Sequence, residues 1–258
     1  MIDLRLGDCL EVMKTIEDNS IDAIITDPPY GTTACKWDSV IDFELMWEQL
    51  NRIIKPNGAI VLFGSEPFSS ALRMSNIKNY KYDWVWKKNK FSNHLNAKRQ
   101  PMRAYENLSV FYKKQCVFNR IPFRIGTQKN YSNGKGKEGS GNWGNHYKGD
   151  LSTIEKPIKS AINHLEFNCV HPDSKEYSGH STQKPIELME YLIKTYTNEN
   201  ETVLDFTMGS GSTGVAAKNA NRNFIGIEQD DKYFDIAKAR LSETTETEAQ
   251  QTIFDQGA

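Results

Sequence analysis

A GxGxxG turn occupies Gly209 to Gly214, near the C-terminal end of the chain. The apolar segment Thr202 to Asp205 before it predicts a short buried strand, and a helix should follow the turn as far as about Ala220. The next predicted strand, Asn223 to Glu228, ends on an acid roughly 20 residues after the first glycine. Glycines in such a turn let a ligand approach the backbone at a helix N-terminus, and the acid can accept hydrogen bonds from both ribose hydroxyls. The segment therefore predicts a site for a nucleotide-containing cofactor.

The position of this turn requires an unusual order of strands along the chain. Only 30 residues follow Glu228, too few for the remaining strands of a doubly wound sheet. Those strands must come from the N-terminal part, and Leu4 to Asp8 is the segment expected beside the strand that ends at Glu228. Asp8 would then face the cofactor crevice and accept a hydrogen bond from an adenine amino group. The predicted fold class is α/β, with a circularly permuted Rossmann-like sheet.

Apolar patterns indicate the other elements. Ile21 to Thr26 is an apolar run that stops at two prolines, which cannot donate ladder hydrogen bonds. A helix is expected over Phe43 to Ile54, closed by a turn at Pro56-Asn57-Gly58, and Ala59 to Phe63 has the continuous apolar pattern of a strand buried on both faces. The remaining expected elements are strands at Tyr82–Trp86 and Leu108–Tyr112, a helix over Pro185–Tyr196 and a last helix ending near Leu241.

The tetrapeptide Asp27-Pro28-Pro29-Tyr30 follows the strand that the apolar run Ile21 to Thr26 predicts. It resembles the D/N/S-P-P-Y/F motif of the amino-group DNA methyltransferases, which use S-adenosylmethionine as methyl donor. The lone pair of an aromatic amine is delocalised, so two acceptors, the Asp27 carboxylate and the Pro28 carbonyl, would draw its hydrogens and favour a reactive tetrahedral nitrogen. Tyr30 would stack on a base swung out of the duplex. The predicted catalytic residues are Asp27, Pro28, Pro29 and Tyr30.

The order of the motifs is similar to that of the β group of these enzymes, in which a target-recognition region lies between the catalytic and cofactor motifs. Gln115 to Ser178, rich in Gly, Asn, Ser and Lys, fits that region. The resemblance implies that the H-x-x-Q-K-P stretch from His180 to Pro185 lies beside the methionine end of the cofactor. It also implies a catalytic half at 1–114, a recognition lobe inserted at 115–178, a cofactor-binding half at 179–241 and a flexible tail at 242–258.

One departure from the family pattern lies just before the glycines. The family reads D-P-F-x-G there, whereas this chain has Asp205-Phe206-Thr207-Met208-Gly209. Because Asp205 keeps its spacing to the glycines, the site is retained, and we expect Phe206 to pack on the adenine ring. The predicted cofactor-binding residues are Asp8, His180, Thr182, Gln183, Lys184, Asp205, Phe206, Gly209, Gly211, Thr213 and Glu228.

The residue at position 27 also bears on the target base. Asp favours adenine N6 over cytosine N4, because the β-group cytosine enzymes more often carry Ser there. Methylation at cytosine C5 needs a Pro-Cys nucleophile, and none of the four cysteines follows a proline. The predicted reaction is site-specific methylation of adenine N6, with cytosine N4 as the alternative.

The formal net charge of -1 hides a strongly basic middle segment. Lys81 to Lys137 hold 14 lysines and arginines but two acids, Asp83 and Glu106, and aromatic residues are interleaved with them. Such a segment can neutralise phosphates and stack on bases, although a solvated basic face has the same composition. The residues predicted to bind DNA are Lys87, Lys88, Lys90, Lys98, Arg99 and Arg103.

Three other classes of protein share parts of these patterns. Methyltransferases acting on RNA or on protein glutamine also use D/N-P-P-Y, but they place the cofactor motif before it. A NAD-dependent oxidoreductase would explain the glycine turn and leave Asp27 to Tyr30 unexplained; binding of S-adenosylhomocysteine would separate the two. A catalytically silent DNA-binding protein would have no need of the filled catalytic positions.

The bulk composition is that of an ordinary globular protein, with 38% hydrophobic residues and no apolar run near the roughly 20 residues that span a bilayer. The cysteines stand apart, without the CxxC pairs of metal sites, and the N-terminus lacks the pattern of a secretory signal. We expect a cytoplasmic protein that binds double-stranded DNA, without a membrane or metal site. The sequence leaves open a homodimer, a restriction endonuclease partner and the recognition sequence.

Overall fold

The computed structural model describes residues 1–31, 38–121, 161–180 and 182–242. Within them the chain forms an eight-stranded sheet in the order β1-β8-β7-β2-β3-β5-β4-β6. β5 is antiparallel to both of its neighbours, and the other strand pairs are parallel. The strands are β1 Ile2–Leu6, β2 Ile21–Thr26, β3 Ile54–Gly64, β4 Tyr80–Ser92, β5 Arg103–Phe111, β6 His164–Glu166, β7 Thr202–Asp205 and β8 Asn223–Glu228.

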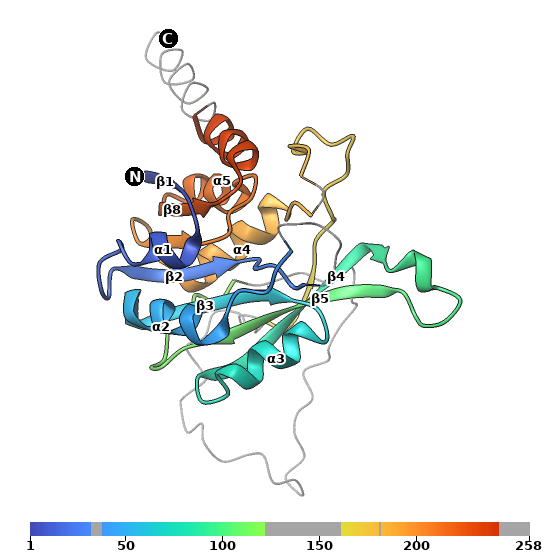
Figure 1. Ribbon diagram of the computed structural model, residues 1–258, viewed down its shortest axis with the longest axis horizontal. Helices are drawn as coiled ribbons and strands as arrows, with labels where there is room; N and C mark the ends of the chain where they lie inside the picture. The colour runs from blue at the N-terminus through green and yellow to red at the C-terminus, as the bar shows by residue number, and fades with distance from the viewer. Residues whose placement is uncertain (32–37, 122–160, 181, 243–258) are drawn as a thin grey trace, which may run out of the picture.

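Helices cover both faces of this sheet (Figure 1). They are α1 Cys9–Met13, α2 Phe43–Ile53, α3 Phe68–Ser75, α4 Ile186–Tyr196 and α5 Ser212–Asn219, with a further helix over 231–242. Successive strand residues point to opposite faces, so Ala23 and Ile25 belong to the core that includes α4 and α5, while Ile24 belongs to the core that includes α1, α2 and α3. Burial on both faces accounts for the continuous apolar pattern of the central strands.

The N-terminal strand lies where the sequence predicts. β1 pairs in parallel with β8, from Ile2 opposite Phe224 to Leu6 opposite Glu228, and Gly7 N donates to Glu228 O at 2.9 Å. The circularly permuted α/β sheet is therefore confirmed. Asp8 lies beyond the strand as the N-cap of α1, with Oδ1 accepting from Leu10 N at 2.9 Å.

Two strands at the centre of the sheet determine where a ligand can bind. β7 and β2 are parallel neighbours, but the chain continues from β7 to β8 on one side and from β2 to β3 on the other. Connections that leave in opposite directions open a crevice at the carboxyl ends of the two strands. Asp205 ends β7 and Thr26 ends β2, so the cofactor and catalytic motifs meet at this crevice.

The turn expected at Pro56-Asn57-Gly58 is wrong. These residues lie inside β3, whose register against β2 is irregular: Ile21 pairs with Ile54 and Ala23 with Ala59. The extra residues form a bulge, which absorbs the proline without breaking the strand. Gly58 is required there because a Cβ would lie 2.8 Å from the Asp22 carbonyl oxygen.

The β4–β5 hairpin extends past the sheet (Figure 1). β4 runs parallel to β3, so its last residues continue beyond the edge where the crevice lies. We call residues 87–103 the arm; its tip contains a 3-10 turn, His94–Asn96.

The expected recognition lobe is described only in part, because residues 122–160 lie outside the described ranges. From its C-terminal portion, β6 joins the sheet beside β4, with Leu165 opposite Trp86. The expected flexible tail, apart from residue 242, also lies outside the described ranges. None of the helices in the described ranges is both long and apolar enough to cross a bilayer.

Candidate active site

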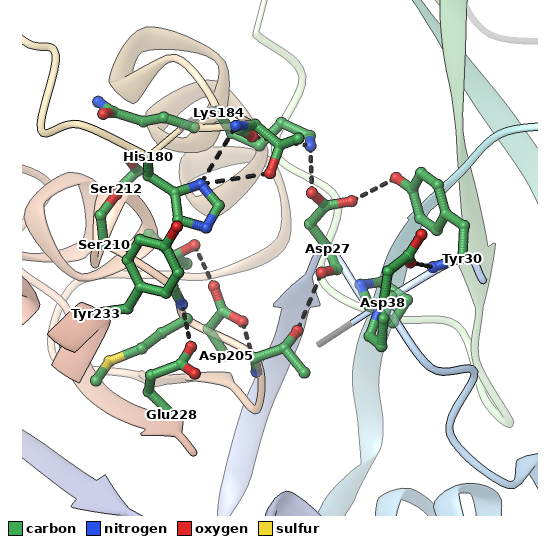
Figure 2. A pocket seen from close by; sticks show the side chains of 18 of the residues that line it. Asp27, Tyr30, Asp38, His180, Lys184, Asp205, Ser210, Ser212, Glu228 and Tyr233 are labelled. Carbon is green, nitrogen blue, oxygen red and sulfur yellow. Dashed lines mark hydrogen bonds and ion pairs between the residues drawn. The ribbon is translucent and has the colours of Figure 1, made fainter. Parts of the chain in front are cut away.

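A cavity of about 980 Å³ opens at the carboxyl ends of β7 and β2. It brings together segments from opposite ends of the chain: the motif at Asp27 to Tyr30, His180 with residues 182–184, and the glycine turn (Figure 2). All four predicted catalytic residues line it. The predicted cofactor-binding residues that line it are Asp8, His180, Thr182, Gln183, Lys184, Asp205, Phe206, Gly209, Thr213 and Glu228.

Gly211 is the predicted cofactor-binding residue that does not line the cavity. It precedes α5 with φ of +79°, and a Cβ there would lie 2.9 Å from Ala237 Cβ. The glycine is thus required for the left-handed turn and for close packing on the helix over 231–242, and its contact with the cofactor stays a prediction.

Glu228 holds the glycine turn from the end of β8. Its Oε2 accepts from Gly209 N at 2.8 Å, and its Oε1 accepts from Gln229 N and Asp230 N, each at 2.9 Å. Burial raises the pKa of Glu228, and these three N–H groups oppose the rise. A carboxylate has about four lone-pair sites, so it can still accept from hydroxyl groups in the cavity.

Asp205 links the ends of the two central strands beneath the cavity. It accepts from Thr213 Oγ1 at 2.5 Å, from Thr207 N at 3.1 Å and from the Thr26 hydroxyl. Burial raises its pKa to about 6. Asp205 is 3% exposed, so its contacts shape the turn from below.

Thr207 stands where the resembled family has phenylalanine, and its hydroxyl has a polar role here. It lies 2.8 Å from Thr26 Oγ1 and 3.1 Å from the Asp27 carbonyl oxygen, to which it donates. The glycine turn is thereby tied to the Asp27 motif. The neighbouring Phe206 is 1% exposed within the sheet core, and its packing on an adenine ring stays a prediction.

Asp27 lies at the mouth of this arrangement, with 24% of its side chain exposed. One carboxylate oxygen accepts from the Tyr30 hydroxyl and the other from the Lys184 ammonium (Figure 2). Burial raises the pKa of Asp27, and the positive charge of Lys184 opposes the rise.

Lys184 therefore contacts the predicted catalytic carboxylate, whereas the resemblance implied a place beside the cofactor. Its side chain is 9% exposed, and its Nζ also lies 3.6 Å from Glu106 Oε2. Burial opposes the charged form, but the carboxylates of Asp27 and Glu106 outweigh it and raise the pKa of Lys184 to about 12. The Lys184 ammonium thus favours the ionised form of Asp27, against the effect of burial.

Tyr30 and the following backbone are held by Asp38, which the sequence reasoning missed. Asp38 Oδ1 accepts from Tyr30 N and Gly31 N, each at 2.8 Å. The Tyr30 ring packs on Phe68, with 5.0 Å between centroids. Stacking of Tyr30 on a base stays a prediction.

The residues before α4 also line the cavity. The His180 ring packs edge-on against Tyr233, with 4.3 Å between centroids, and burial lowers the pKa of His180 to about 4, so the ring is neutral near pH 7. Gln183 fixes the loop: its Oε1 accepts from Ser178 N at 2.9 Å and its Nε2 donates to Glu176 O at 2.7 Å.

The residues predicted to bind DNA divide into two groups. Lys88 turns inward, with 12% of its side chain exposed and Nζ donating to Glu106 Oε1 at 2.9 Å. Arg103 is half-buried and donates to Ser65 Oγ. The exposed members are Lys87, which pairs with Glu166, and Lys90, Lys98 and Arg99.

Glu106 is the other residue that sequence reasoning missed. It lies on β5, within the cavity lining, between Lys88 and Lys184. A signal was present, because Glu106 is one of two acids in the basic stretch from Lys81 to Lys137. An acid that stands among so many cations is a candidate for a buried ion pair.

Comparisons with known proteins agree with this geometry. A family model described as DNA methylase matches residues 21–239. The chain is 30% identical to the type II methyltransferase M.HinfI of Haemophilus influenzae, over 92% of this chain and 67% of that protein. It is also 30% identical to the DNA adenine methyltransferase YhdJ of Escherichia coli (strain K12), over 91% of this chain and 81% of that protein. The crystal structure of the M1.HpyAVI-SAM complex superposes with a TM-score of 0.63 at 30% identity, covering 93% of this chain and 99% of that one.

Proposed function

Because the chain belongs to the DNA methylase family, we propose that it transfers a methyl group to N6 of adenine at specific sites in double-stranded DNA. The chain is an S-adenosylmethionine-dependent DNA methyltransferase. Two observations support adenine as its base: an aspartate stands at position 27, and YhdJ, a DNA adenine methyltransferase, is among the relatives.

The cavity has a volume in the range of ligand sites and offers donors and acceptors that suit S-adenosylmethionine. It holds a carboxylate at the end of β8, suited to ribose hydroxyls, and a glycine turn whose Gly209 has φ of +51°. Asp8 and Glu228 would hold the nucleoside part, and His180 and Thr182 would line the methionine end. When bound, this cofactor supplies an electrophilic methyl group.

The residues of this chain would do the rest of the chemistry at the target amine. The Asp27 carboxylate and the Pro28 carbonyl would accept hydrogen bonds from the amine N–H groups and direct the nitrogen lone pair toward the methyl donor. Tyr30 would hold the flipped base, and the charge of Lys184 would favour the ionised form of Asp27. The observation that carries this proposal is that Asp27 and Glu228 line one cavity although 200 residues separate them in sequence.

DNA would approach the same edge of the sheet. The arm starts there, and Lys90 and Phe91 line the cavity, so phosphates held by Lys98 and Arg99 would lie near its mouth. We assign the reading of the target sequence to the lobe at 115–178. This assignment rests on its position between the two motifs.

The test is direct identification of the product. Purified protein is incubated with S-adenosylmethionine and unmethylated genomic DNA, and the DNA is digested to nucleosides for mass spectrometry. N6-methyladenine is the expected product, absent with Asp27→Ala. If the product is N4-methylcytosine, the target base is cytosine and not adenine. An absence of any methylated nucleoside would overturn the proposed function.

A further inference from the structure

Four charged side chains alternate in sign along one wall of the cavity. Asp27 at the end of β2 contacts Lys184, whose Nζ lies 3.6 Å from Glu106 Oε2, and Glu106 Oε1 accepts from Lys88 at 2.9 Å. Side-chain exposure is 24% for Asp27, 9% for Lys184, 14% for Glu106 and 12% for Lys88. The chain of charges is neutral in sum, which lets it exist away from water.

One oxygen in this row of charged side chains, Glu106 Oε2, lacks a hydrogen-bond donor within the described residues. This oxygen is also buried. The Lys184 ammonium lies at ion-pair distance from Oε2 and not at hydrogen-bond distance. A shift of roughly 1 Å would bring the two to ordinary hydrogen-bond length.

When a target amine binds Asp27, the Lys184 ammonium needs another acceptor such as Glu106 Oε2. Both carboxylate oxygens of Asp27 already accept, one from Lys184 and one from the Tyr30 hydroxyl. Each of these oxygens keeps one free lone-pair site, so an amine hydrogen that binds Asp27 shares the carboxylate with the Lys184 ammonium and weakens its hold on that ammonium. A buried ammonium cannot give up an anionic partner unless another acceptor stands within reach.

We propose that Glu106 is a positioning residue for methyl transfer: it accepts the Lys184 ammonium as the target amine takes its place on Asp27. Glu106 acts through Lys184 and has no contact with the reacting atoms. Lys88 holds its other oxygen and fixes the direction in which Oε2 points. The proposal rests on the proposed function, because it needs Asp27 to receive the amine.

The test compares Glu106→Gln with Asp83→Asn, the other acid of the basic stretch. Asp83 lies on β4 outside the cavity lining, so its variant should transfer methyl groups at the wild-type rate. Glu106→Gln should lower the single-turnover rate by about 100-fold, as expected when a reacting group loses its alignment, with S-adenosylmethionine affinity unchanged.

The pH profile separates positioning from a merely structural role. The charged or titratable groups facing Asp27 are Lys184, Glu106, Tyr30 and Asp205; those facing Lys184 are Asp27, Glu106 and His180. The charge of Glu106 raises the pKa of Asp27, so Glu106→Gln should move the acidic limb of the rate profile to lower pH. A loss of fold would reduce the amount of active enzyme at every pH without moving the limb.

Glu106→Asp serves as the second variant if Glu106→Gln does not fold. It keeps the charge and shortens the reach, so it should recover part of the rate and leave the acidic limb near that of the wild type. A wild-type rate in Glu106→Gln, or an unshifted limb, would overturn the proposal. If the wild-type protein itself methylates no DNA, the proposed function fails instead, and the two failures are distinguished by that control.

Discussion

Lys87 and Lys88 are neighbours in the sequence, yet they have opposite surroundings. The pleat of β4 turns Lys87 outward, where it pairs with Glu166 at 58% exposure, and turns Lys88 inward to Glu106 at 12% exposure. A step of one residue along the strand thus separates a solvated charge, Lys87, from a buried ion pair, that of Lys88 with Glu106. The charge count of the basic segment therefore says little about which lysines can reach a phosphate. Burial and pairing should instead rank the effects of removing each charge.

We expect the largest effect on stability when a buried charge is removed. Lys184→Met leaves Asp27 and Glu106 as two carboxylates without their shared cation, which should lower the free energy of unfolding by about 3–5 kcal/mol. Lys194→Met is the matched control, since Lys194 pairs with Glu190 at 43% exposure and should contribute less than about 1 kcal/mol. Urea denaturation measures both. Equal losses in the two variants would contradict the ranking by burial.

The same variant gives a pH test. Lys184 lowers the pKa of Asp27, so its removal should move the acidic limb of the methylation rate to higher pH, opposite to the shift expected for Glu106→Gln. For stability, the pKa of Lys184 is raised from 10.5 to about 12 in the folded protein. Its stabilising charge is thus fully present below about pH 10.5 and lost as pH rises through about 12.

A half-buried carboxylate should have an intermediate effect. Glu228→Ala removes the acceptor proposed for the ribose hydroxyls, so cofactor binding should weaken by roughly 1.5–3 kcal/mol. Calorimetric titration with S-adenosylmethionine measures it, with Glu190→Ala, outside the cavity lining, as the control. An unchanged Kd in Glu228→Ala would remove this residue from the site.

The exposed arm should show the smallest effect on stability and a specific effect on DNA. If Lys98 and Arg99 each contact a phosphate, their double alanine variant should reduce the slope of log affinity against log salt by about 1.8, since each contact contributes about 0.9. Lys78 and Lys81, exposed before and at the amino end of β4, are the control pair. Duplex binding at several salt concentrations measures both. The same slope in both double variants would make the arm a solvated surface.

The arrangement of strands was predictable because each strand has a local signal. Apolar runs, the prolines after Thr26 and the short stretch after Glu228 were sufficient to place the N-terminal strand beside β8. Shorter elements were missed: α1 has five residues and β6 three, too few for a periodic pattern. The Asp8 side chain that caps α1 was a usable signal, although it was interpreted only as a cofactor contact.

The partners within the cavity were not predictable in the same way. Lys184 and Asp27 are separated by 157 positions, and nothing in either local pattern shows that the two side chains meet. The inward direction of Lys88 depends on the register of β4, which residue spacing alone did not reveal. Gly211 was assigned to the cofactor because its motif is read as a unit, whereas its packing against Ala237 depends on a later helix.

The division of labour inside the cavity is the central claim, and one variant tests it most directly. Asp27→Ala removes the carboxylate that we propose addresses the target amine, and it leaves the residues around Glu228 intact. The account predicts that methyl transfer to DNA from labelled S-adenosylmethionine is abolished while calorimetric Kd for the cofactor stays within a few-fold of the wild-type value. Undiminished methyl transfer by this variant, or loss of cofactor binding in proportion to loss of rate, would contradict it.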